Sequence, residues 1–405
     1  MTACAIETAA EDDDRDGEHP GRGARPTEFT TGLTITANGA YAARLAGDGD
    51  ALYVERWTLD GPEPYAVPLP LDQPEEPGTQ LLPLADGRVL VARRVDGRRN
   101  TFSLLYPTGP ATGELRLGAV EAPGSEQLVL LPPSPDGICA YAMCVGPDTT
   151  TLWLVAGGAF GPEQVAEVKG RCGGGVWLDR TGRMLALDRR LDDGPVKAIA
   201  VDLERGGEVT PLLQITEDSN DRLLLADPDS GLLLIRSDAP SPGHDRLGWG
   251  VLGSLLPVRF PECLRLDDAA VTPFAVQPGQ VLMPETCAVA LRIDAAAGSW
   301  VGTWQPMARR MGQLAAPVGW LAGAGLWTAG GVLRLPYATA GAPCGLADVE
   351  APPEPEPGPE PVATAVAVGG SAGASAGPDA AVEEPRVCRP VPLQQAPLTD
   401  GKPAG

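Results

Sequence analysis

The chain has 405 residues and a formal net charge of −22, of which residues 1–28 carry −5 and residues 346–405 carry −6. So acidic a polypeptide repels phosphate backbones, which argues against a nucleic-acid partner. It contains 51 glycines and 43 prolines, a composition that favours many tight turns over long helices.

The N-terminal segment 1–27 is expected to be a disordered acidic tail. It begins MTACAIETAAEDDD and so carries acid where a secretory signal needs positive charge. None of the eight cysteines forms a CxxC pair, which excludes a zinc ribbon and a thioredoxin motif. We therefore expect a cytoplasmic protein with buried free thiols.

After this segment, one pattern recurs seven times: an apolar run, a turn that ends in glycine, and a second apolar run. The glycines of these turns are 45–50 residues apart, at Gly39, Gly87, Gly137, Gly182, Gly231, Gly279 and Gly325. In most periods two further turns follow, 10–12 and 21–24 residues after the glycine. Three turns separate four strands, and a four-stranded antiparallel sheet with this period is the blade of a β-propeller.

Segments between these turns have strand composition. Residues 51–58, 101–106, 151–155 and 196–201 are short and rich in β-branched and aromatic side chains. Residues 311–333 lack charge over a length that could span a membrane, but their glycines and Pro317 favour strands in phase with the repeat. We expect no membrane partner. Glu28–Thr30 is expected to close the ring by pairing with Val332–Tyr337.

The fold prediction is therefore an all-β protein: a seven-bladed β-propeller of four-stranded antiparallel blades over residues 28–347. Residues 348–405 are expected to be a disordered acidic tail rich in proline, alanine and glycine, since they include EAPPEPEPGPEPV and GGSAGASAGP.

The turn Ser134–Gly137 reads SPDG between two apolar runs. It resembles the turn signature of TolB-like and WD40-like propellers, and of the propeller that precedes the hydrolase domain in prolyl oligopeptidases. Degenerate versions occur as ADG at 85–87, RTG at 180–182 and QPG at 277–279. The resemblance implies the fold, and no active-site residue of those families maps onto this chain.

A search for chemistry finds no catalytic, cofactor-binding or metal-binding set. Two GxSxG matches, within 369–377, lie in a Gly/Ala/Ser linker beyond the last histidine, His244, and are interpreted as compositional. His244 beside Asp245 is interpreted as a solvated loop pair, and His19 lies in the acidic tail. Neither a Walker loop nor a spaced carboxylate loop for calcium is present. Whether the protein is an enzyme stays open, with the balance against.

Four arginines surround one predicted hairpin turn, Asp96–Gly97, and are the candidate partner-binding residues: Arg93, Arg94, Arg98 and Arg99. Guanidinium groups clustered at one hairpin could grip a carboxylate or phosphate. The leading hypothesis is a non-catalytic platform for protein–protein interaction with an unidentified protein partner. The alternative is a small-molecule or lyase/hydrolase-type site in the central channel. The oligomeric state stays open.

Overall fold

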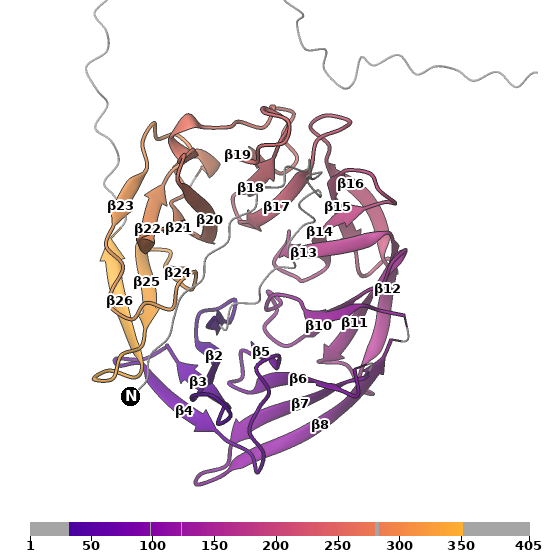
Figure 1. Cartoon of the computed structure of the whole chain (residues 1–405), viewed down its shortest axis with the longest axis vertical. Helices are drawn as coiled ribbons and strands as arrows, with labels where there is room; N and C mark the ends of the chain where they lie inside the picture. The colour runs from indigo at the N-terminus through magenta and orange to yellow at the C-terminus, as the bar shows by residue number, and fades with distance from the viewer. Residues whose placement is uncertain (1–31, 98, 123, 280–282, 351–405) are drawn as a thin grey trace, which may run out of the picture. The chain divides into compact units, whose positions relative to one another are not determined.

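The computed structural model describes residues 32–97, 99–122, 124–279 and 283–350. These residues form seven antiparallel sheets arranged around a ring, which confirms the predicted all-β seven-bladed propeller (Figure 1). Five sheets have four strands and two have three. Both predicted tails, 1–27 and nearly all of 348–405, lie outside the described residues.

The blades follow one another along the chain. Blade 1 comprises β1 (Thr34–Ile35), β2 (Tyr41–Ala46), β3 (Tyr53–Thr58) and β4 (Tyr65–Leu69); blade 2 comprises β5 (Gln80–Pro83), β6 (Val89–Val95), β7 (Arg99–Pro107) and β8 (Thr112–Glu121); blade 3 comprises β9 (Gln127–Leu130), β10 (Ala140–Val145), β11 (Thr149–Ala156) and β12 (Glu163–Lys169); blade 4 comprises β13 (Arg171–Trp177), β14 (Met184–Arg190), β15 (Val196–Asp202) and β16 (Glu208–Leu213). Blade 5 comprises β17 (Asp221–Ala226), β18 (Leu232–Ser237) and β19 (Arg246–Val251); blade 6 comprises β20 (Ala269–Val276), β21 (Val289–Ala295), β22 (Gly298–Trp304) and β23 (Gly312–Leu314); blade 7 comprises β24 (Leu326–Trp327), β25 (Val332–Tyr337) and β26 (Gly345–Glu350).

Consecutive antiparallel strands give each blade two ends with different connections. The connections from first to second strand and from third to fourth strand lie at one end, which we call the hairpin face. The connections from second to third strand and the crossovers between blades lie at the other end, which we call the crossover face.

The hydrophobic core lies between blades rather than inside any one of them. Each of seven buried clusters joins two successive blades: for example, Val54 of blade 1 clusters with Val89 of blade 2. The cluster of Leu33, Trp57 and Ala324 joins blade 1 to the segment that enters blade 7. Since each blade is apolar on both of its faces, its stability depends on its neighbours, and packing of blade 1 on blade 7 completes the ring.

The recurring glycines have a structural reason. Gly137 has a left-handed φ of +68°, and a Cβ built there would lie 2.5 Å from the Cβ of Ala85 in the turn of the preceding blade. Gly39 has a φ of +73° and faces Leu326 of blade 7 in the same way. At these two turns the backbone conformation and the close approach both favour glycine.

The observed strands differ from the predicted ones in blade 5, at the ring closure and at the C-terminal end of the propeller. Blade 5 has three strands, and an isolated bridge between Trp249 and Arg259 stands where its fourth strand would begin. Both edges of β25 are paired, with β24 and with β26, and the predicted closing segment 28–30 lies outside the described residues. The last strand reaches Glu350, beyond the predicted domain end at 347.

The charge-free segment 311–333 contains the short strands β23 and β24, as the repeat predicts. Helical structure in the described part of the chain consists of two 3-10 turns, η1 (Glu262–Leu264) and η2 (Pro284–Thr286). No helix among these residues has the length and apolar character needed to cross a membrane.

Six of the cysteines fall within the described residues, and all six are free thiols. Cys144, Cys172 and Cys287 are buried, whereas Cys139, Cys263 and Cys344 are half-buried. Burial raises the pKa of Cys144 and Cys172 to about 11. The expectation of free thiols is confirmed for these six, while burial holds for three of them.

Candidate functional site

Three of the hairpin arginines predicted as a partner site, Arg93, Arg94 and Arg99, lie at the crossover face of blade 2, each in different surroundings. Arg93 is half-buried and bonds Glu75 through two nitrogens, at 2.6 and 2.8 Å, and Glu114 at 3.1 Å. Burial tends to lower the pKa of Arg93, but the hydrogen bonds and charges of these two carboxylates outweigh it and raise the pKa. Its charge is therefore compensated within the blade.

The remaining hairpin arginines have other surroundings. Arg94 donates from Nε and Nη2 to the carbonyl of Gly97, at 3.1 and 2.7 Å. These bonds stabilise the hairpin turn that follows Arg94. Exposed Arg99 lies 3.8 Å from Glu121 on the neighbouring strand. Arg98 lies outside the described residues. Partner binding by these four residues stays a prediction.

Exposed apolar side chains instead gather on the opposite face. Seven of the twelve exposed large apolar side chains in the described residues lie on loops of the hairpin face. Five of these seven belong to the adjacent blades 5 and 6, and together they define the apolar patch: Leu252, Leu255, Leu256, Met283 and Met307. Leu255 is 85% exposed and Met283 is 67% exposed, values that the packing of a core does not explain.

The loops that carry the apolar patch are joined to one another. The amide of Leu252 donates to the carbonyl of Gly231, in the turn between β17 and β18. The neighbouring Ser230 packs against Gly279, in the loop that follows β20, so the turns of blades 5 and 6 touch. Within blade 6, the amide of Met307 donates to the carbonyl of Glu285 at 3.0 Å. The apolar patch therefore rests on connected loops of two blades.

Basic residues border the apolar patch. Arg309 and Arg310 follow Met307 after one intervening alanine, and both are exposed. Arg259, which follows the loop of Leu255 and Leu256, is also exposed and lies over the ring of Trp249, with its guanidinium carbon 4.9 Å from the ring centre. These three arginines supply basic groups at the border of the patch, and Glu285, whose carbonyl accepts from the Met307 amide, adds an acidic one.

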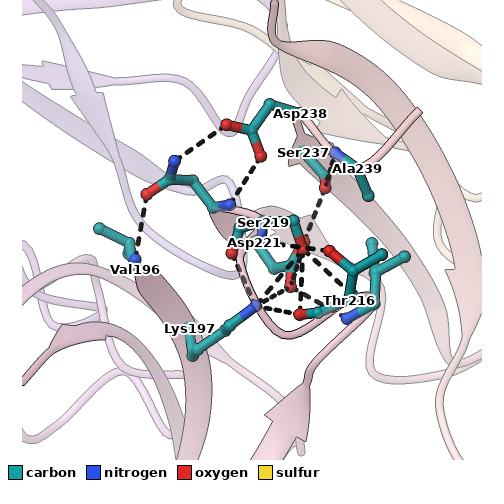
Figure 2. A network of polar contacts seen from close by, with 10 residues as sticks. Val196, Lys197, Thr216, Ser219, Asp221, Ser237, Asp238 and Ala239 are labelled. Carbon is teal, nitrogen blue, oxygen red and sulfur yellow. Dashed lines mark hydrogen bonds and ion pairs between the residues drawn. The ribbon is translucent and has the colours of Figure 1, made fainter. Parts of the chain in front are cut away.

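A second feature of blade 5 is a buried polar network at the crossover face, shown in Figure 2. Asp221, the first residue of β17, is fully buried, and its carboxylate accepts from Lys197 Nζ at 2.9 Å and from Ser237 Oγ at 2.6 Å. Lys197 also donates to the carbonyl oxygens of Thr216 and Ser219, at 2.5 and 2.6 Å. Charge and hydrogen-bonding capacity are satisfied within the network, so its role is to hold the crossover 214–220 between blades 4 and 5.

Neither the apolar patch nor the buried network is evident from the sequence alone. The apolar patch is formed by loops far apart in the chain, and its residues stand out only when the exposure of each side chain is known. The network pairs Lys197 of β15 with Asp221 of β17, across two blades. The sequence held one signal for the network. Lysine is scarce in this chain, and one of its only three lysines, Lys197, lies inside a predicted strand.

Comparison with known proteins supports the fold and goes no further. No family model matches the sequence, and no curated protein matches it. Prolyl oligopeptidase B from Galerina marginata is 13% identical, with a TM-score of 0.51 over 79% of this chain and 49% of its own. Puromycin hydrolase is 15% identical, with a TM-score of 0.50 over 81% of this chain and 52% of its own.

A putative TolB from Agrobacterium tumefaciens is also similar, at 14% identity and a TM-score of 0.38 over 55% of this chain and 76% of its own. This chain spans about half the length of the oligopeptidase and of the puromycin hydrolase. At such identities the likeness shows the fold alone. The chain is thus a seven-bladed β-propeller whose solved structural neighbours include a TolB and a prolyl oligopeptidase, as the SPDG turn indicated.

Proposed function

We propose that the protein is a non-catalytic propeller platform that binds another protein through the apolar patch. The observation that carries the proposal is the concentration of exposed leucine and methionine side chains on joined loops of blades 5 and 6. Exposed apolar side chains that lie together are a feature of protein interaction sites, and methionine adapts to partners of varied shape.

The charges around the patch indicate the chemistry of the partner. Because Arg309 and Arg310 border the patch, the complementary surface is an apolar segment next to acidic residues. A second copy of this chain is disfavoured, since two chains of net charge −22 repel each other. The cytoplasmic location expected from the sequence belongs to this proposal, and cell fractionation tests it.

The test compares three forms of the full chain as bait in native lysate, followed by mass spectrometry. They are the wild type, the double variant Leu255→Ser/Leu256→Ser, and the control Val318→Ser, which removes an equally exposed apolar side chain from the crossover face. We expect one near-stoichiometric protein with the wild type and with the control, and its loss from the double variant.

The same set of proteins on all three baits would contradict the proposal. A wild-type dimer in light scattering that the double variant lacks would replace the foreign partner by a second copy. The alternative function, a ligand site in the central channel, stays a prediction. So does binding at the blade 2 hairpin, for which Arg94→Glu/Arg99→Glu is the corresponding variant.

A further inference from the structure

A cleft lies at the crossover face between blades 5 and 6, on the opposite end of these blades from the apolar patch. Its volume is about 300 Å³, near the lower end of the range for small-molecule sites. It is lined by the end of β18, the start of β19, the crossover around η1 and the start of β20. Residues of this lining include Arg236, Asp245, Arg246, Arg265, Leu264 and Val271, and we call it the arginine cleft.

Three guanidinium groups and one carboxylate thus line a single small cavity. The charges of two of these arginines are balanced by carboxylates that do not line the cleft. Arg246 bonds Glu262 at 2.8 Å, and Arg265 lies 3.5 Å from Asp267. Arg236 differs, because its guanidinium donates to the backbone carbonyl of Val271, at 3.1 Å, and it forms no ion pair with any described carboxylate. A half-buried cation without a bonded counter-charge is costly to a fold.

The strand register adds a second unfavourable charge. Arg236 on β18 stands directly opposite Arg222 on β17, so two arginines leave the same face of the sheet side by side. Arg222 reaches only to 3.9 Å from Asp188, which is longer than a hydrogen bond. Burial and the charge of Arg222 lower the pKa of Arg236, and the charge of Asp245 offsets this in part. Like charges directly opposite each other destabilise a sheet.

The neighbouring residues show that this pair is held in place. Asp221 and Ser237, which precede Arg222 and follow Arg236 on the two strands, are also cross-strand partners and are bonded to each other in the network of Figure 2. That network points toward blade 4, so the alternation of a strand sends Arg236 toward blade 6, whereas Arg222 on the inner strand reaches toward Asp188 of blade 4. Arg236 is thereby fixed beside an open cavity.

We propose that the arginine cleft is a binding site for a small oxyanion, a carboxylate or phosphate group, which contacts Arg236. Such a group supplies the counter-charge that the fold lacks, and the planar guanidinium matches its geometry. Exposed Asp245 accepts a hydrogen bond from a hydroxyl or amino group of the ligand and repels an anion without such a donor. The site is independent of the apolar patch.

The experiment measures the thermal unfolding of the full chain in rising concentrations of inorganic phosphate, of succinate, and of sodium chloride at matched ionic strength. Binding to the folded state raises Tm with a saturable dependence on ligand concentration. We expect this for phosphate or succinate beyond the chloride series, and the salt with the lower half-saturation identifies the preferred oxyanion.

Two variants change the affinity in opposite directions. Arg236→Gln weakens binding at least tenfold and leaves Tm without ligand nearly unchanged, because it also relieves repulsion with Arg222. Asp245→Asn, at an exposed position that the fold tolerates, tightens binding of phosphate several-fold. The control Arg116→Gln removes a guanidinium that is 87% exposed in blade 2 and leaves the affinity unchanged.

A Tm that rises no more in phosphate or succinate than in chloride would overturn the proposal. Equal half-saturation in the wild type and in Asp245→Asn would do the same, even if Arg236→Gln fails to fold. Neither outcome depends on whether the apolar patch binds a protein, so Leu255→Ser/Leu256→Ser is expected to bind the oxyanion as the wild type does.

Discussion

Asp188 is a buried carboxyl whose ionisation opposes folding. It lies on β14, is 7% exposed, and accepts the Leu223 amide at 3.1 Å, with Arg222 Nη1 at 3.9 Å. Burial outweighs the amide and the arginine and raises the pKa to about 6, from an ordinary value of 3.8. The uncharged form is therefore the better fit to the fold. Asp188→Asn keeps an oxygen for the Leu223 amide and removes the charge.

The size of the effect follows from linkage. A raised folded-state pKa means that Asp188 binds a proton more tightly in the folded chain than in the unfolded chain, so its own contribution to stability is greatest below pH 4 and is lost as the pH rises through 6. The difference between the two pKa values corresponds to about 3 kcal/mol at most. For the roughly 320-residue propeller this amounts to about 4 °C in Tm. Asp188→Asn is expected to gain most of this at pH 8 and little of it at pH 4.

Calorimetry or thermal fluorescence of wild type and variant from pH 4 to pH 8 measures the difference. Asp193→Asn, in an exposed turn, is the matched control and is expected to show no such pH-dependent gain. Lower stability of Asp188→Asn than of the wild type at pH 8 would refute an unfavourable ionisation of Asp188. An equal difference in stability between the two proteins at pH 4 and at pH 8 would refute it as well.

Two further substitutions test how the blades are held. Gly137→Ala places a Cβ 2.5 Å from Ala85 at a φ of +68° and should cost about 1–3 kcal/mol more in urea unfolding than Gly206→Ala, where φ is +67° and nothing lies within 4 Å. Equal losses at the two glycines would assign the whole cost to φ. Lys197→Met leaves the fully buried Asp221 without its cation and should cost about 3–5 kcal/mol, partly recovered in Lys197→Met/Asp221→Asn. A loss below about 1 kcal/mol in Lys197→Met would contradict a structural role for the pair.

The fold was predictable because the spacing of the turn glycines marks the blades. At several of these turns the glycine also approaches the neighbouring blade, as Gly137 does to Ala85 and Gly39 to Leu326. The strands themselves could be predicted from the spacing of the turns and from the residue composition between them. In blade 5 a single bridge replaces the fourth strand, and this could not be predicted. The turn glycine Gly253 is at the expected position, and its presence does not tell whether the chain after the turn pairs as a strand.

The candidate sites were hidden for a geometric reason. Arg93 and Arg94 are adjacent in sequence, but neighbours on a strand point to opposite faces, and the carboxylates that bond Arg93 come from distant residues, Glu75 and Glu114. Conversely, Arg222 and Arg236 are far apart in the chain and become direct neighbours only through the register of β17 and β18. Charge clustering along the sequence is therefore a poor guide to charge clustering on a blade.

Both proposed sites take residues from the same segment of blade 5, which follows β19. After β19, the chain pairs with its sheet only at the bridge between Trp249 and Arg259, so the segment that other blades use as a fourth strand is free to take another path. Before the bridge it exposes Leu255 and Leu256 at the hairpin face, and beyond it the chain reaches the crossover face through η1 and lines the arginine cleft. A complete fourth strand starting at Arg259 would commit the residues after the bridge to ladder hydrogen bonds. The reduced pairing of blade 5 thus leaves the segment after the bridge free to line the arginine cleft.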